Sequence, residues 1–153
     1  MEYRALLLVH ILASMVWVGA AVVIPGTMFH ARRSRDPEKV DRVMRSMSWA
    51  GTWLAIPMPL LVVVSGFGMV LISGAWSFTQ AWILTSIALV VIYELVAHIV
   101  GGRLYGRIAA ARAADAIAGD DYARAQSALA RLDLVLIMIL VIIVWSMVVK
   151  PGI

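Results

Sequence analysis

The sequence predicts an all-α polytopic membrane protein, a four-transmembrane-helix bundle with a helical cytoplasmic extension between helices 3 and 4. Of its 153 residues, 63% are hydrophobic and 14% are charged, whereas soluble domains are about half apolar and about a quarter charged. The mean hydropathy is +0.93. These values argue against a soluble enzyme and a disordered chain. The lack of cysteine argues against a disulfide scaffold and excludes a thiolate metal site.

Four long apolar runs are the second observation. They cover approximately residues 5–29, 49–73, 81–100 and 132–149. Each is close to the ~20 residues that a helix needs to cross the hydrocarbon core of a bilayer. The spans must be helical because lipid offers no hydrogen-bond partner to free backbone groups. We therefore expect one membrane domain over residues 1–153, with a bend in the second span at Pro57 and Pro59.

The positions of the charges predict the orientation. Eleven of the thirteen basic residues lie in residues 30–48 and 101–131, which fall on the same side of a four-span protein. The positive-inside rule places these loops in the cytoplasm and both termini outside, as in a multi-pass protein of the bacterial inner membrane. The expected partners are the lipid bilayer and its anionic headgroups. Nucleic acid is not expected, because no aromatic residues alternate with the basic ones.

Both cytoplasmic loops contain helix signals. Asp36 followed by Pro37 is a typical helix start, and the helix that begins there should continue into the second span. In residues 101–131, alanine-rich sequence predicts that the third span continues past the headgroups and ends at Gly119. Asp120 or Asp121 should then cap the helix that leads into the fourth span.

Ionisable residues inside spans are costly and mark candidate sites. His10 lies in the outer half of the first span, with Trp17 on the same helical face, and Met69 and Met147 come from spans that end in the same leaflet. A histidine and a thioether can ligate the iron of haem b. The alternative is that His10 forms hydrogen bonds within the bundle while the methionines fill space.

A second group of polar residues is expected in the inner leaflet. Glu94 and His98 are one helical turn apart, His30 ends the first span at a similar depth, and Asp133 enters from the fourth. Carboxylate and imidazole at this spacing could bind a divalent metal or relay a proton. Alternatively, Glu94 pairs with a nearby arginine or with His98 and has only a structural role. His10 and His98 lie in opposite leaflets, so one haem cannot use both.

The first span also resembles a known type of membrane helix. It reads LLLVHILASMVWVGAAVVIPGTMFHARR, in which His10 precedes Trp17-x-Gly19, Pro25 and a final His30. This pattern is similar to the first span of HemJ-type protoporphyrinogen oxidases and of CopD-like copper-resistance membrane domains. It also resembles a related small bacterial four-span integral membrane family of unknown function. The basic first loop and the closing MVVKPG extend the resemblance over most of the chain.

The sequence departs from the HemJ type at two places. That type usually has an arginine directly after the span-one proline and a lysine in span three shortly after a tryptophan. Here Gly26 and the apolar residues after Trp82 occupy those places. The resemblance to the family of unknown function is therefore the better match. His10 is the cofactor residue that the resemblance implies.

Three functions remain open at this point. In the first, the bundle binds haem b or a porphyrin and has a redox role, which in an enzyme would be HemJ-like oxidation of a porphyrin. In the second, His10 with a methionine handles copper, which prefers soft ligands in its reduced state. In the third, the chain is a non-catalytic accessory subunit, bound to a membrane protein partner or to copies of itself.

Overall fold

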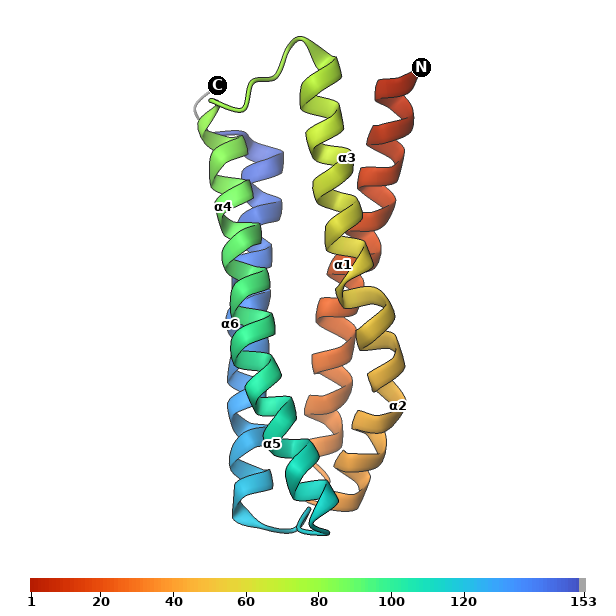
Figure 1. Ribbon diagram of the computed structural model, residues 1–153, viewed down its shortest axis with the longest axis vertical. Helices are drawn as coiled ribbons and strands as arrows, with labels where there is room; N and C mark the ends of the chain where they lie inside the picture. The colour runs from red at the N-terminus through yellow and green to blue at the C-terminus, as the bar shows by residue number, and fades with distance from the viewer. Residues whose placement is uncertain (152–153) are drawn as a thin grey trace.

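The computed structural model describes residues 1–151, apart from the side chains of residues 50, 52 and 55. Every regular element in that part of the chain is helical (Figure 1). The elements are α1 (Glu2–Arg32), α2 (Pro37–Ala55), α3 (Pro57–Ser73), α4 (Ala81–Val96), the π-helix η1 (Ala97–Gly101), α5 (Gly102–Ala113) and α6 (Asp120–Val149). The all-α prediction is confirmed.

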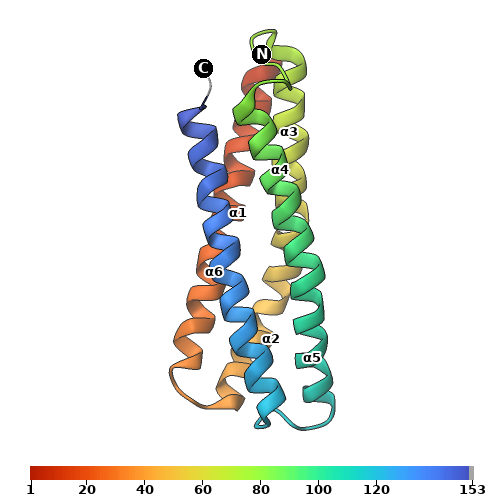
Figure 2. The same ribbon diagram turned by 90° about the vertical axis from the view of Figure 1, so that its left-hand side faces the viewer.

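The helices form two long antiparallel pairs. In one pair, α1 lies against α2 and α3, and in the other, the continuous rod α4–η1–α5 lies against α6 (Figures 1 and 2). The N-terminus, the end of α6 and the α3–α4 connection share one end of the molecule, and the α1–α2 and α5–α6 connections share the other. The two basic loops are thus at the same end, as the charge pattern predicts.

Three helices of the described chain are long and apolar enough to cross a membrane. They are Glu2–Arg32, Ala81–Ala113 and Asp120–Val149, and the 17-residue α3 is a shorter apolar helix. The expected second span, residues 49–73, is divided at Ile56 because Pro57 has no N–H to continue the hydrogen-bond ladder of α2. The expected bend therefore occurs there as a break between two helices.

The helix ends in the basic loops agree with the prediction at one place and differ at two others. The N-cap residue of α6 is Gly119, so the prediction that Asp120 or Asp121 caps this helix is wrong. Asp36 caps α2, accepting hydrogen bonds from the backbone N–H groups of Glu38 (3.0 Å) and Lys39 (3.3 Å). The prediction that the third helix runs to Gly119 is wrong, because α5 ends at Ala113. Asp115 adopts a left-handed conformation (φ 53°), and the N–H groups that follow the helix close back onto its last carbonyls.

The core consists of two clusters stacked along the bundle. The cluster nearer the basic end joins α1, α2, α5 and α6 around Met28, Ile108 and Leu129, and the other joins α1, α3, α4 and α6 around Trp17, Val62 and Leu140. Large apolar side chains also cover much of the outer surface, including Leu71, Leu134 and Val148. Such a surface is stable only against lipid or another apolar partner.

Candidate functional site

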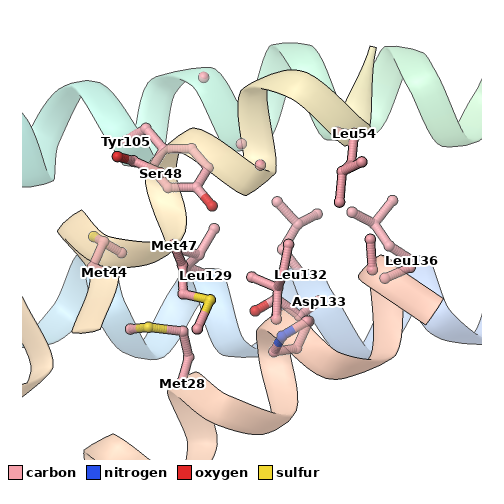
Figure 3. Close-up of a pocket in the computed structure, with 18 of the residues that line it drawn as sticks. Met28, Met44, Met47, Ser48, Leu54, Tyr105, Leu129, Leu132, Asp133 and Leu136 are labelled. Atoms are coloured by element: carbon pink, nitrogen blue, oxygen red, sulfur yellow. The ribbon is translucent and has the colours of Figure 1, made fainter. Parts of the chain in front are cut away.

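A cavity of about 520 Å³ lies between the two helix pairs, in the half of the bundle nearer the basic loops. Most of its wall is apolar. Figure 3 shows Met28, Met44 and Met47 gathered at one part of this wall, with Leu132, Asp133 and Leu136 of α6 beside them. Small-molecule sites in proteins typically occupy about 300–1,000 Å³ and combine apolar walls with a few polar groups, so this cavity is the candidate site.

Irregular backbone surrounds the cavity on three sides. The break at Ile56 is on one wall, and the π-helix Ala97–Gly101 is on the opposite one. On α1, Pro25 lines the cavity together with Ala21, whose carbonyl would receive the N–H that proline lacks in a regular helix. Breaks of this kind prevent close packing of helices, and π-helical turns are frequent at functional sites.

Glu94 of α4 and Asp133 of α6 supply carboxyl groups to the cavity wall. Glu94 Oε2 is 3.4 Å from His98 Nδ1, while Glu94 Oε1 is buried without a hydrogen-bond partner in the described chain. The same His98 nitrogen donates to the backbone carbonyl of Glu94 at 2.9 Å. Asp133 is half-buried, and the guanidinium of Arg32 is the opposite charge that acts on it.

The structure therefore brings together three of the four residues of the expected inner-leaflet group. Glu94, His98 and Asp133 all line the cavity, whereas His30 is an exposed residue outside this lining. The described residues contain no group of three His, Cys, Asp or Glu side chains that could hold a metal ion. Trp17, expected beside His10 at the outer site, lines this cavity instead and packs edge-on against Tyr93, with ring centroids 5.1 Å apart.

His10 lies at the contact between α1 and α3. Its Nδ1 is 2.9 Å from the carbonyl oxygen of Val62 and 3.2 Å from the Ser65 hydroxyl. Because a carbonyl can only accept, Nδ1 carries the proton and Nε2 is the acceptor nitrogen. Gly66 permits this approach, since a Cβ there would be 3.3 Å from the imidazole Cε1. The other two residues of the expected outer site, Met69 and Met147, are half-buried on α3 and α6.

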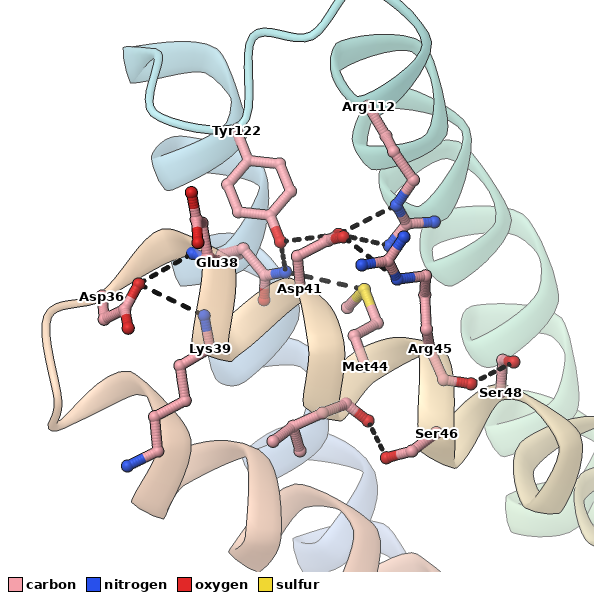
Figure 4. Close-up of polar contacts among 12 residues, drawn as sticks. Asp36, Glu38, Lys39, Asp41, Met44, Arg45, Ser46, Ser48, Arg112 and Tyr122 are labelled. Carbon is pink, nitrogen blue, oxygen red and sulfur yellow. Dashed lines mark hydrogen bonds and ion pairs between the residues drawn. The ribbon is translucent and has the colours of Figure 1, made fainter.

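A buried polar cluster joins the helices at the basic end. The carboxylate of Asp41 in α2 accepts hydrogen bonds from Arg112 Nε of α5 (2.8 Å) and from the Tyr122 hydroxyl of α6 (3.2 Å), as Figure 4 shows. Gln126 donates to the Tyr122 oxygen and accepts from Arg32 of α1. Four helices are thus linked by one chain of hydrogen bonds.

The electrostatics of this cluster favour the ionised form of Asp41. Burial alone would raise the pKa of the Asp41 carboxyl. The hydrogen bond and charge of Arg112, the hydrogen bond of Tyr122 and the charge of Arg45 outweigh this effect, so the pKa lies below its ordinary value. Sequence reasoning missed the cluster, because Asp41 and Arg112 are separated by 70 residues and resemble ordinary solvated charges. A carboxylate on an otherwise apolar face of α2 with Val40 and Met44 is the signal that could have found it.

Comparison with known proteins identifies the family. A family model described as "Predicted integral membrane protein (DUF2269)" matches residues 4–151. No curated protein and no solved structure matches the chain. The match covers every helix described above except the first two residues of α1, and the apolar outer surface of these helices agrees with the family description. The chain is therefore an integral membrane protein of the DUF2269 family.

Proposed function

We propose that this chain spans the bacterial inner membrane four times, with its basic loops in the cytoplasm and both termini outside. The second of these spans would be α3 with the last turns of α2, where the exposed Trp49 and Trp53 suit the lipid interface. The shared end of the two basic loops supports this orientation.

Cysteine labelling in intact cells tests the orientation, because the native chain has no cysteine. Ala75, in the α3–α4 connection, and Ala118, in the α5–α6 connection, are both exposed. A membrane-impermeant thiol reagent should label Ala75→Cys from outside and should reach Ala118→Cys only after the membrane is opened. Labelling of Ala118→Cys from outside would overturn the orientation.

The biochemical function that the geometry supports best is binding of a hydrophobic small molecule between the two helix pairs. The single observation that carries this proposal is the cavity of about 520 Å³ with its apolar wall and few polar groups. A tightly packed bundle would close such a space, because membrane helices associate through close contact of small residues. Here the small residues Ala97 and Gly101 of η1 and Ala20 of α1 line an open space instead.

A neutral diazirine-bearing arylalkane photoprobe tests this binding in lipid nanodiscs. Saturable labelling is expected on peptides that contain the cavity residues Met44, Met47 or Leu136. Ala97→Phe, which fills the cavity, should abolish the labelling. The matched control Ala88→Phe, at an exposed position of α4 outside the cavity, should not. Labelling that never saturates and is equal in both variants would refute the proposal.

A second candidate function is haem b binding at His10 with a redox role, which one observation favours. The Nδ1 proton of His10 is engaged by Val62 and Ser65, leaving Nε2 as the acceptor. Metal-ligating histidines typically donate their other nitrogen in this way. Met69 or Met147 is the candidate second ligand, and bound haem would supply one-electron transfer. The cavity itself suits a porphyrin poorly, because Glu94 and Asp133 would repel its carboxylates.

The absorption spectrum of purified protein decides this second candidate. Reconstitution with haem should produce a Soret band in the wild type that is lost in His10→Ala. His30→Ala removes an exposed histidine outside the candidate site and serves as the control. A wild-type protein without a Soret band after reconstitution would eliminate haem binding at His10.

A further inference from the structure

We infer that the ligand of this cavity is a hydrophobic cation, with the carboxylate of Glu94 as its counter-ion. The inference rests on the proposed binding function and specifies the chemical class of the ligand. It depends on which charges of the cavity wall already have partners. Those charges are carried by Glu94, Asp133, Arg45, Arg112 and, when protonated, His98.

The cationic groups of the wall are largely engaged elsewhere. Arg112 donates two hydrogen bonds to the carboxylate of Asp41, and Arg45 forms an ion pair with the same carboxylate at 3.3 Å. Both side chains thus belong to the cluster at the basic end. With Asp41 the two arginines keep one net positive charge, which lies in this cluster and not beside Glu94.

Glu94 is in the opposite situation. Among the described residues its one ion-pair contact is with His98, whose side chain is 56% exposed and which is neutral unless protonated. Oε1 of Glu94 is buried and has no hydrogen-bond partner within the described part of the chain. An unpaired carboxylate oxygen in an apolar wall is costly, and a cation in the cavity would offset that cost. Asp133 is less available, because Arg32 already acts on it.

The rest of the wall suits a bulky organic cation better than a bare metal ion. Trp17, Tyr93 and Tyr105 line the cavity, and aromatic rings attract ammonium-like cations. Methionine side chains adapt to ligands of different shape. Hydrophobic amines, quaternary ammonium compounds and phosphonium ions share this chemistry.

Equilibrium dialysis of the detergent-purified protein against tritiated tetraphenylphosphonium tests the inference. We expect saturable binding to the wild type. Glu94→Gln should lose affinity by about tenfold or more, since interactions with a charged group are stronger than those with a neutral one. Asp133→Asn should lose less. Asp121→Asn is the matched control, because its side chain is 95% exposed and lies outside the cavity.

A comparison on the wild-type protein needs no variant. Tetraphenylborate has the shape of tetraphenylphosphonium and the opposite charge, so it should bind at least about tenfold more weakly. Equal affinity for the two ions, or undiminished tetraphenylphosphonium binding by Glu94→Gln, would overturn the inference. The neutral photoprobe should still label Glu94→Gln saturably. If it labels the wild type but the charge tests fail, the cation inference alone is wrong, whereas failure of the photoprobe itself refutes the binding function.

Discussion

Replacing Asp41 by alanine should loosen the basic end of the bundle. The Asp41 side chain is 3% exposed and is shared by Arg112, Arg45 and Tyr122. Removing one partner of a buried ion pair costs about 3–5 kcal/mol. The side chains of Arg112 and Arg45 that remain are 33% and 63% exposed, so water can solvate part of each charge. We therefore expect a loss of about 3 kcal/mol, at the low end of that range.

Hydrogen exchange measured by mass spectrometry resolves where this loss occurs. A loss of about 3 kcal/mol corresponds to roughly a hundredfold increase in local opening, which should appear in residues 37–48 of α2 and leave α3 unchanged. Asp121→Ala is the control, because the contact of that exposed residue with Arg124 is 4.0 Å long and should contribute at most about 1 kcal/mol. Unchanged exchange in α2 of Asp41→Ala, or equal changes in both variants, would refute the reasoning.

The same cluster predicts a dependence on pH. The pKa of Asp41 is lower in the folded protein than its ordinary value, so its contribution to stability is fully present above about pH 4. The contribution is lost as the pH falls through the folded value. As the pH is lowered, local opening of α2, measured by hydrogen exchange, should therefore increase more in the wild type than in Asp41→Asn. The same pH dependence in both proteins would contradict the role assigned to the Asp41 carboxylate.

Three further predictions concern local contacts. Asp36→Ala should cost about 1 kcal/mol by removing the cap of α2, seen as roughly fivefold faster exchange in its first turn. Gly66→Leu should crowd His10, whose Cε1 would be 3.3 Å from the new Cβ, and lower the stability in detergent by about 1–3 kcal/mol, measured by thermal unfolding. Lys150→Ala should remove a cation–π contact, in which Lys150 Nζ lies 4.3 Å from the centroid of the Trp76 ring. The loss of about 1 kcal/mol should appear as faster exchange in the last turn of α6.

Matched variants separate these effects from general destabilisation. Asp36→Asn keeps a capping side chain and should behave like the wild type. Gly19→Leu adds the same bulk as Gly66→Leu where a Cβ meets nothing within 4 Å. Lys39→Ala removes an exposed lysine at the end of the molecule opposite to the last turn of α6 (Figure 1). Equal losses in a variant and its control would contradict the contact concerned.

The sequence predicts the helices well where local chemistry determines them. Long apolar runs define α1, α4 and α6, and the Asp36–Pro37 pair marks the start of α2. The end of α5 was not predictable in the same way, because its alanine-rich sequence favours continued helix up to Gly119. Asp115 ends it in a left-handed conformation that glycine or asparagine adopts more readily.

The sequence predicts part of the candidate site, because it groups Glu94, His98 and Asp133, but it does not predict the cavity that they line. Glu94, His98 and Asp133 were recognisable because ionisable groups are rare in apolar spans. Their assembly around one cavity depends on the break at Ile56 and on η1. The sequence carries no signal for a π-helix at Ala97–Gly101. The tertiary partners of His10 were equally hidden, since Val62 and Ser65 are more than 50 residues away.

The π-helix has a consequence for how this family could change by insertion and deletion. A π turn contains one more residue than the α turn that it replaces. Deleting one residue from Ala97–Gly101 would thus close the wide turn while keeping the packing faces of α4 and α5 in place. A deletion elsewhere in these helices would rotate one face by about 100° relative to the other. Because η1 forms one wall of the cavity, a single codon could remodel the pocket without disturbing the fold.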